Sequence, residues 1–298
     1  MLVGVTGATG FLGRALVKRL LASGHRVRAW YRLGSDRGGL PAQVQWLPGN
    51  LGDRDACDGL VRGVDAVVHA AFEWPESDTS LLQSLRTNFL GSLQLIESAR
   101  ESGVGRFVYI SSGAVHERIL DDRPLDETHP AWPTDHYGAI KSSVEAFVFS
   151  YGLGMRWPIC ALRPVRIYGV DRPPNQSVHW HLVAAVLRGQ PLDVSGGGKM
   201  VHADDVARAV EVLLHAPSDR IAGQAFECCD GYIANETVAR IVCELAGVNP
   251  PLNAQPSTPR HQIVTRKLLD LGMTFGGEAL LRQTIAELIA AWRAEAGH

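Results

Sequence analysis

The stretch "TGATGFLG", residues 6–13, decides how the rest of the chain is interpreted. It joins a short apolar run to a segment of helical character, with glycines at positions 7, 10 and 13. A strand that turns directly into a helix directs the free N–H groups of the helix at the turn, where they attract a phosphate. Gly7 allows the tight bend, Gly10 the close approach of a diphosphate, and Gly13 the packing of the helix on the strand. The stretch therefore predicts a dinucleotide-binding turn, against the alternative of an ordinary glycine-rich turn.

Around this turn, short β-like runs alternate with helical segments through the first half of the chain. The strands are expected at Leu2–Thr6, Arg26–Tyr31, Val44–Leu47, Ala66–His69, Phe107–Ser111 and Ile159–Leu162. The helices are expected at Phe11–Ala22, Arg54–Val61, Ser80–Ser102 and Tyr137–Tyr151. Such alternation predicts an α/β fold of Rossmann type, a doubly wound parallel sheet whose ligand site lies at the carboxyl ends of the strands.

The second half is less regular, because clusters of proline and glycine divide it into short pieces. Helical segments stand out at His181–Arg188 and Ala279–Glu295. We expect this half to cap the sheet as a smaller C-terminal α/β substrate lobe without a core of its own. The expected dinucleotide-binding domain comprises residues 1–164 with parts of 200–230, and the expected substrate lobe comprises residues 165–200 and 220–298.

Composition restricts the class of protein. The chain has 298 residues, of which 46% are hydrophobic, and a formal net charge of −2, so it can bury a sizeable core and has no general affinity for nucleic acid or anionic membranes. It contains no apolar run long enough to span a membrane, and we expect no secretion signal. The five cysteines form no CxxC pair, and their odd number favours reduced thiols in a cytoplasmic protein: Cys57, Cys160, Cys228, Cys229 and Cys243.

The end of the second expected strand bears on the cofactor. An acidic residue at this place would bind the ribose hydroxyls of NAD, but the chain has Tyr31 followed by Arg32. A guanidinium offers a bidentate partner for the additional phosphate of NADP, and Arg37 is placed to assist. The sequence therefore favours NADP, with NAD as the other possibility and a solvated surface arginine as the structural alternative.

The segment "YGAIK", residues 137–141, places Tyr137 and Lys141 one helical turn apart, with Cβ atoms roughly 5–6 Å from each other. A phenol has a pKa of about 10, and a neighbouring ammonium lowers that pKa towards the range where acid–base catalysis is efficient. Alone, the pair is better explained as a surface contact, because this spacing is common by chance in helices.

A second segment, "YISSG", residues 109–113, adds hydroxyl groups at the same sheet edge. Ser111 and Ser112 follow a strand directly, where a hydroxyl is able to hold a substrate oxygen beside the tyrosine. The alternative role of these serines is to cap a turn.

Taken together, these segments resemble the short-chain dehydrogenase/reductase superfamily in its extended branch, the NAD-dependent epimerase/dehydratase family. The resemblance runs nearly end to end. Its further motifs are "GNLGD" (49–53), "VVHAA" (67–71), "NFLGS" (88–92), "SSGAVHE" (111–117), "DETHPAWPTDHYGAIKSSVE" (126–145), "LRPVRIYG" (162–169) and "VHADDVARA" (201–209).

The resemblance implies a division of roles. Tyr137 would be the acid/base, Lys141 would lower its pKa and bond the nicotinamide ribose, and Ser112 would orient the reacting oxygen. The implied cofactor contacts are Gly7, Gly10, Phe11, Leu12, Gly13, Arg32, Asn50, Leu51, Ala70, Ala71, Asn88, Ser111, Tyr137, Lys141 and Pro164. It also implies a homodimer, because the family pairs the helix that matches residues 81–99 with its copy.

Two departures from the family pattern concern the substrate. Where sugar-nucleotide enzymes carry an arginine that grips the diphosphate, this chain has Gly198 with Lys199 beside it, and a lysine is not a bidentate fork. Gly113 and Ala114 follow Ser112 in place of the acidic pair of the dehydratases, which argues against sugar dehydration.

Three further residues are candidates for the substrate pocket: His116, His179 and Trp180. The "HWH" segment, residues 179–181, does not indicate a metal site, since residues two apart on a helix do not face each other and zinc needs three or four ligands. We therefore expect no metal.

The sequence thus predicts an NADP-preferring oxidoreductase that transfers hydride between nicotinamide and a carbonyl or secondary alcohol of a small molecule. A sugar-nucleotide 4-epimerase with tightly bound NAD is the first alternative. A non-catalytic NADP-binding sensor is the second, although a sensor has no need of an acid/base.

Overall fold

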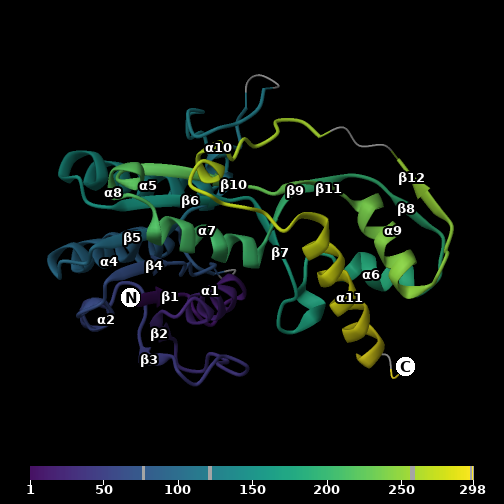
Figure 1. The fold of residues 1–298 in the computed structure, drawn as a ribbon, viewed down its shortest axis with the longest axis horizontal. Coiled ribbons are helices and arrows are strands. Elements are labelled where there is room, and N and C mark those ends of the chain that lie inside the picture. Colours follow the sequence, from purple (N-terminus) through teal and green to yellow (C-terminus); the bar gives the residue numbers. More distant parts are fainter. Residues whose placement is uncertain (76–77, 120–122, 256–258, 296, 298) are drawn as a thin grey trace.

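The computed structural model describes residues 1–75, 78–119, 123–255, 259–295 and 297 (Figure 1). Its centre is a seven-stranded sheet in which all neighbouring strands run parallel. In spatial order the strands are β10 (Gln224–Cys228), β6 (Ile159–Pro164), β5 (Arg106–Ile110), β4 (Ala66–His69), β1 (Leu2–Thr6), β2 (Arg26–Tyr31) and β3 (Gln45–Pro48). The chain builds the sheet outward from β1 to β3 on one side and from β4 to β10 on the other. The doubly wound Rossmann arrangement expected from the sequence is therefore confirmed.

Helices cover both faces of this sheet because successive strand residues point to opposite sides. On one face α1 (Phe11–Ala22) and α7 (Ala203–His215) bury apolar side chains against residues such as Val3 and Val5. On the other face lie α2 (Arg54–Val61), α4 (Gly91–Glu101) and α5 (His136–Met155), which pack against residues such as Val67 and Phe107. Two apolar cores therefore hold the sheet between helical layers.

The glycine-rich turn brings α1 unusually close to β1. A Cβ atom at Gly13 would lie 1.9 Å from the carbonyl oxygen of Gly7, and one at Gly7 would lie 2.8 Å from the backbone of Ala70 and Ala71. Gly7 also has a φ of +70°, which glycine adopts without strain. The roles expected of these two glycines, a tight bend and close helix packing, match this geometry.

The helix expected over residues 80–102 forms in three parts. It begins as α3 (Leu81–Ser84), passes through a π-helical stretch η1 (Leu85–Leu90) and continues as α4. A π-helical segment inside an α-helix is rare and displaces the side chains around it relative to a regular helix. Asn88 lies in this stretch, which matters for the site described below.

The second half of the chain forms a lobe beyond the strand ends, on the right of Figure 1. It contains a three-stranded sheet, β11–β9–β7, and a two-stranded pair, β12–β8. Its elements are β7 (Arg166–Tyr168), α6 (Trp180–Leu187), β8 (Leu192–Val194), β9 (Gly197–His202), β11 (Gly231–Ala234), α9 (Asn235–Ala246), β12 (Leu252–Ala254) and α11 (Gly277–Glu295). The remaining short helices are η2 (Gly113–His116), η3 (Pro174–Gln176), α8 (Ser218–Ile221) and α10 (Arg266–Leu269).

The expectation that this lobe lacks a core of its own was wrong. Apolar side chains of α6, α9 and α11 form a third buried cluster, which includes Leu182, Val238 and Ile285. The chain also returns to the main sheet, because β10 pairs with β6 and α7 covers one face of that sheet.

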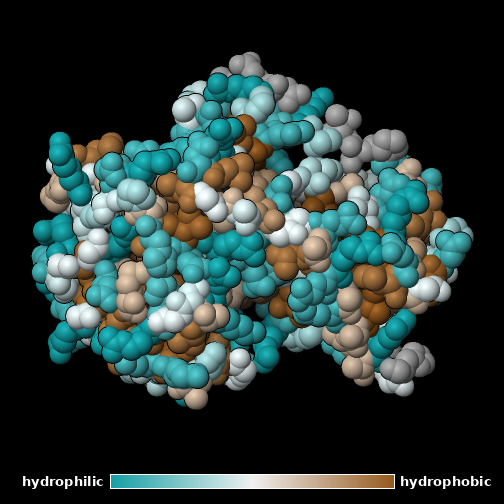
Figure 2. Space-filling view, in the orientation of Figure 1, coloured by the Kyte–Doolittle hydropathy of each residue, from teal (hydrophilic) through white to brown (hydrophobic). Residues whose placement is uncertain are grey.

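Apolar and hydrophilic residues are mixed over the face shown in Figure 2. No helix in the described ranges is long and apolar enough to cross a membrane.

We predict that Gly13→Ala destabilises the fold by about 1–3 kcal/mol or more, because the added methyl group collides with backbone rather than with a movable side chain. Gly59→Ala is the matched control: Gly59 lies inside α2, and a Cβ there meets nothing within 4 Å. The control should stabilise the protein by up to about 1 kcal/mol. Urea unfolding of both variants measures the difference, and equal effects would contradict the close approach of α1.

Candidate active site

A cavity of about 1420 Å³ opens at the carboxyl ends of the parallel strands, between the sheet and the lobe. Most of the residues expected to contact a cofactor line it. They are Gly7, Gly10, Phe11, Leu12, Gly13, Arg32, Asn50, Leu51, Ala70, Ala71, Ser111, Tyr137, Lys141 and Pro164, together with the expected catalytic Ser112. Residues from seven separate segments of the sequence thus meet in one space.

The wall at the start of α1 fits an anionic group. Gly10 is the N-cap residue of this helix, no side chain caps it, and no acidic residue stands in its first turn. A Cβ at Gly10 would meet only the Gly7 carbonyl oxygen, at 3.4 Å, so this side of the turn is open. The free N–H groups of the helix are therefore left for a ligand, as a diphosphate requires.

Unpaired polar atoms in the same wall point to a bound molecule as well. The hydroxyl of Ser111 and the indole nitrogen of Trp30 are buried, and the structure gives neither a hydrogen-bond partner among the described residues. Both residues line the cavity. Because a buried polar group without a partner is costly, a dinucleotide in this cavity fits the residues present.

At the end of β2, the two arginines of interest behave differently. Arg32 lies at the cavity edge with 63% of its side chain exposed, and its nearest carboxylate is that of Glu73, at 3.5 Å. Arg37 instead stacks its guanidinium over the ring of Tyr31, 4.3 Å from the ring centre. Arg32 is thus the more available cation of the two.

The serine, tyrosine and lysine come together where α5 meets the end of β5. The carboxylate of Asp135 caps α5 by accepting a hydrogen bond from the Gly138 N–H at 2.7 Å. One turn later, the buried ammonium of Lys141 donates to the carbonyl oxygen of Ile110 at 2.7 Å. The hydroxyl of Ser112 lies close enough to that of Tyr137 to lower the pKa of the phenol. The three groups therefore share one corner of the cavity.

Burial controls the ionisation of this group. The pKa of Tyr137 is raised because the phenol is partly removed from water, and the nearby Ser112 hydroxyl only partly opposes that shift. This direction is opposite to the lowering by Lys141 that the sequence suggested. Burial also lowers the pKa of Lys141 to about 7, while the carboxylate of Glu145 raises it. Tyr137 therefore holds its proton at neutral pH, whereas Lys141 exchanges between its charged and neutral forms near that pH.

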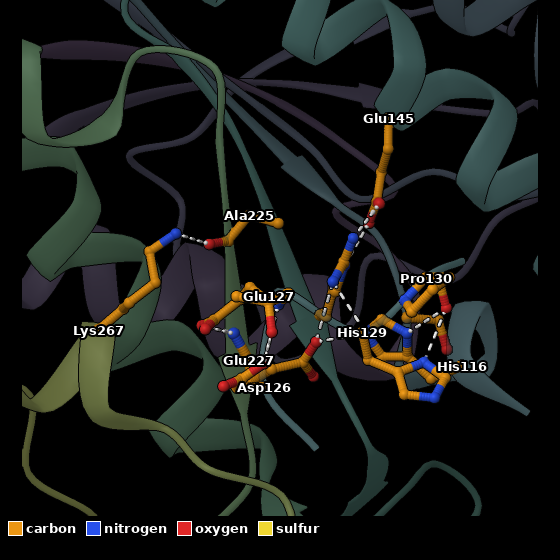
Figure 3. A network of polar contacts seen from close by, with 12 residues as sticks. His116, Asp126, Glu127, His129, Pro130, Glu145, Ala225, Glu227 and Lys267 are labelled. Carbon is orange, nitrogen blue, oxygen red and sulfur yellow. Dashed lines mark hydrogen bonds and ion pairs between the residues drawn. The ribbon is translucent and has the colours of Figure 1, made fainter. Parts of the chain in front are cut away.

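Behind this corner lies a buried ionic network (Figure 3). The guanidinium of Arg163, at the end of β6, donates to both oxygens of Glu145, at 2.9 and 2.7 Å, and to Glu227 of β10 at 3.1 Å. His116 lies 2.9 Å from Glu227 through Nε2 and 3.2 Å from the Pro130 carbonyl through Nδ1. His116 does line the cavity, as expected of a pocket residue, but both ring nitrogens already have partners.

The same network anchors the segment that precedes α5. The carboxylate of Glu127 accepts a hydrogen bond from the Glu227 N–H at 2.8 Å, and His129 contacts the Pro130 carbonyl oxygen at 2.8 Å. On the other side, the Lys267 ammonium donates to the Ala225 carbonyl oxygen at 2.8 Å. Residues far apart in sequence thus tie the cavity wall to the outer strand of the sheet.

Three expected site residues lie outside the cavity wall that the described residues form. Asn88 is buried and holds the backbone of Glu73, through Glu73 N–H at 2.7 Å and Glu73 carbonyl at 2.9 Å, so its amide is occupied. His179 is buried against the ring of Tyr168, and Trp180 packs on the lobe core. The pocket role expected of His179 and Trp180 is therefore not met, because their side chains stabilise the lobe.

Sequence reasoning missed two features of the site. Phe72 and Trp74 line the cavity directly after the "VVHAA" strand end, and that position at the strand edge was the available signal. The second is Glu145, whose spacing of four residues from Lys141 on the expected helix was a signal for an ion pair. Glu227 gave no signal, because its strand was not predicted.

We predict that Arg163→Met lowers the free energy of unfolding by about 3–5 kcal/mol, since it leaves two buried carboxylates without their cation. Arg240→Met is the control, because it removes an exposed arginine paired with Glu236 on α9 and should cost less than about 1 kcal/mol. Urea unfolding at neutral pH compares them. If the two variants lowered the free energy of unfolding by equal amounts, the buried network would not stabilise the protein as predicted.

Comparison with known proteins agrees with this geometry. A 3 beta-hydroxysteroid dehydrogenase/Delta 5-->4-isomerase of Mycobacterium tuberculosis is 31% identical over 302 residues, which cover 95% of this chain and 79% of that protein. A UDP-glucose 4-epimerase of Thermus thermophilus, solved in complex with NAD, superposes with a TM-score of 0.76 at 26% identity, over 97% of this chain and 99% of that chain. RMD from Pseudomonas aeruginosa, complexed with NADPH, shares the fold with a TM-score of 0.74 at 21% identity, over 98% and 99% of the two chains.

The family model described as "NAD dependent epimerase/dehydratase family" matches residues 3–229. These residues include the glycine turn, the Ser112–Tyr137–Lys141 corner and β10, the last strand of the main sheet along the chain. A match over this length, together with the 31% identity to the Mycobacterium tuberculosis enzyme, shows that this chain belongs to the NAD-dependent epimerase/dehydratase family.

Proposed function

We propose that this chain is an NADP-preferring oxidoreductase that interconverts a ketone or aldehyde and the corresponding alcohol of a small molecule. The observation that supports this most is the meeting of Ser112, Tyr137 and Lys141 in the same cavity as the open face of Gly10. The nicotinamide, when bound, supplies or accepts a hydride. The chain's own residues hold the reacting oxygen and handle its proton.

The ionisation of the site suits the reductive direction. A partly buried phenol with a raised pKa keeps its proton at neutral pH, so Tyr137 is ready to donate that proton to a carbonyl oxygen as the oxygen becomes an alkoxide. The Ser112 hydroxyl, which lies near the phenol in the same cavity wall, is placed to hold the same oxygen. The Lys141 ammonium, fixed on the Ile110 carbonyl, favours negative charge nearby.

The proposal keeps the other sequence-based expectations. We assign residues 1–164, with parts of 200–230, to cofactor binding and residues 165–200 and 220–298 to the substrate lobe. His116 supports the cavity from its wall, and Asn88 supports it from behind by holding the backbone of Glu73. We also propose a cytoplasmic homodimer. In support, Leu90 of η1 and Phe147 of α5 expose apolar side chains on neighbouring elements that a second copy would cover.

We predict that Tyr137→Phe retains NADPH binding but lowers turnover of a reducible carbonyl by at least ~10²-fold, the usual scale of acid–base catalysis. Tyr151→Phe is the matched control, because Tyr151 lies on the same helix and bonds Glu97 away from the cavity. Stopped-flow absorbance of NADPH and NADH over a panel of carbonyl compounds measures the rates.

Near-normal turnover in Tyr137→Phe would reject the assigned role. Turnover of a nucleotide sugar without added cofactor, with NAD retained through purification, would support the epimerase instead. Cofactor binding with no turnover of any carbonyl or alcohol would support the sensor.

The NADP preference depends on Arg32. We predict that Arg32→Ala weakens NADPH binding by about 10- to 100-fold, the loss of one charge-assisted hydrogen-bonded contact, and leaves NADH binding nearly unchanged. Arg54→Ala, an exposed and ion-paired arginine on α2, is the control. Equilibrium titration with both cofactors measures the ratio, and an unchanged ratio in Arg32→Ala would contradict the preference.

A further inference from the structure

Two aromatic side chains that the proposed chemistry does not use lie against the catalytic tyrosine. The ring of Trp74 stacks on that of Tyr137, with centroids 4.8 Å apart and planes at 21°. The ring of Phe72 meets Tyr137 edge-on at 4.9 Å and meets Trp74 at 5.0 Å. We call Phe72 and Trp74 the aromatic arm.

The arm is held in place by polar contacts at its base. Asn88 bonds both the N–H and the carbonyl of Glu73, the residue between the two aromatic side chains. The Ala71 N–H donates to the Thr6 hydroxyl at 3.1 Å, and the Lys141 ammonium lies 5.1 Å from the centre of the Phe72 ring. The arm is therefore a fixed part of the site, and Asn88 acts by fixing it.

Much of the arm is nevertheless uncovered. Trp74 is 65% exposed although its ring stacks on that of a catalytic residue and lines the cavity. A tryptophan gains most when its large apolar faces are covered, and such residues concentrate where another molecule packs. Stacking on Tyr137 covers only one face, which leaves the rest of the indole for an occupant of the cavity.

Other parts of the cavity wall also present apolar side chains. Ile119, Leu125 and Ile263 line it, and Leu125 is paired with Ile263 in a short parallel bridge. The bridge is closed by hydrogen bonds of 2.7 Å, from the Leu125 N–H to the Gln262 carbonyl and from the Val264 N–H to the Leu125 carbonyl. Lys199, which lines the same cavity, already donates to the His261 carbonyl oxygen at 2.8 Å.

Resting on the proposed function, we propose that the substrate is a ring ketone or secondary ring alcohol that carries a flat apolar ring next to its reacting carbon. That ring packs on the aromatic arm while the oxygen lies at Tyr137 and Ser112, which makes Trp74 a specificity-determining residue. In the reductive direction the carbonyl carbon receives a hydride from NADPH and the oxygen receives the Tyr137 proton, which yields the alcohol and NADP⁺.

The test compares two ketones that differ by one aromatic ring. We expect the wild-type enzyme to reduce 1-tetralone with a kcat/KM at least about tenfold above that for cyclohexanone, the scale of one aromatic contact with its buried area. Trp74→Ala should remove most of this preference, and Trp74→Phe should keep part of it. Trp132→Ala is the control, because Trp132 is exposed but lies outside the described cavity wall.

A binding measurement separates this inference from the proposed function. Isothermal titration of 1-tetralone into protein saturated with NADP⁺ needs no turnover. Weaker binding to Trp74→Ala than to wild type and Trp132→Ala, by about tenfold, supports the inference even if neither ketone is reduced. Reduction of both ketones with a ratio that Trp74→Ala leaves unchanged overturns it while the proposed function stands. Equal 1-tetralone affinity in all three proteins overturns it in either case.

Discussion

The hydrogen bond from the Lys141 ammonium to the Ile110 carbonyl joins the two elements on which the site depends. Ile110 ends β5, and Ser112 follows two residues later, so this bond fixes α5 against the strand that carries the serine. One helical turn before Lys141, Tyr137 then reaches the Ser112 hydroxyl. Gly138 allows the approach, because a Cβ there would lie 2.6 Å from the Ala114 carbonyl oxygen. Without this contact the acid/base and the hydroxyl would have no common geometry.

Charge in this region is buried but matched. Lys141 and Glu145 lie one turn apart on α5, and Arg163 and Glu227 come from the two outermost strands on that side of the sheet. Burial alone would discharge such groups, as the lowered pKa of Lys141 shows. The opposing partners offset that cost, so the sheet edge, the helix and the cavity wall are held in one arrangement. The network thus stabilises the geometry that the chemistry requires.

Local sequence patterns were sufficient where elements follow one another directly. The bounds expected for β1, α1, β2, α2 and β4 agree with the structure at both ends, because apolar periodicity and glycine or polar boundaries define them. Parts of 200–230 were assigned to the dinucleotide-binding domain, but β10 was not predicted as a strand, since its partner β6 lies about sixty residues earlier and long-range pairing leaves no local pattern. The core of the lobe was missed for the same reason.

Part of the candidate site could also be predicted from the sequence. The glycine turn and the Ser112, Tyr137 and Lys141 set share the cavity as expected, because each follows a strand or a helical spacing that fixes its place. The direction of the Tyr137 pKa shift was not readable, since it depends on burial rather than on the neighbour in sequence. Asn88 was assigned from the family resemblance, and His179 and Trp180 from the "HWH" segment. Packing directs the side chains of all three elsewhere.

A crystal structure of the protein with NADP⁺ tests the central claim most directly. The account predicts the diphosphate against the open face of Gly10 at the start of α1 and the nicotinamide beside the Tyr137 hydroxyl, with Lys141 still on the Ile110 carbonyl. A diphosphate bound elsewhere, or a nicotinamide turned away from Tyr137, would contradict it.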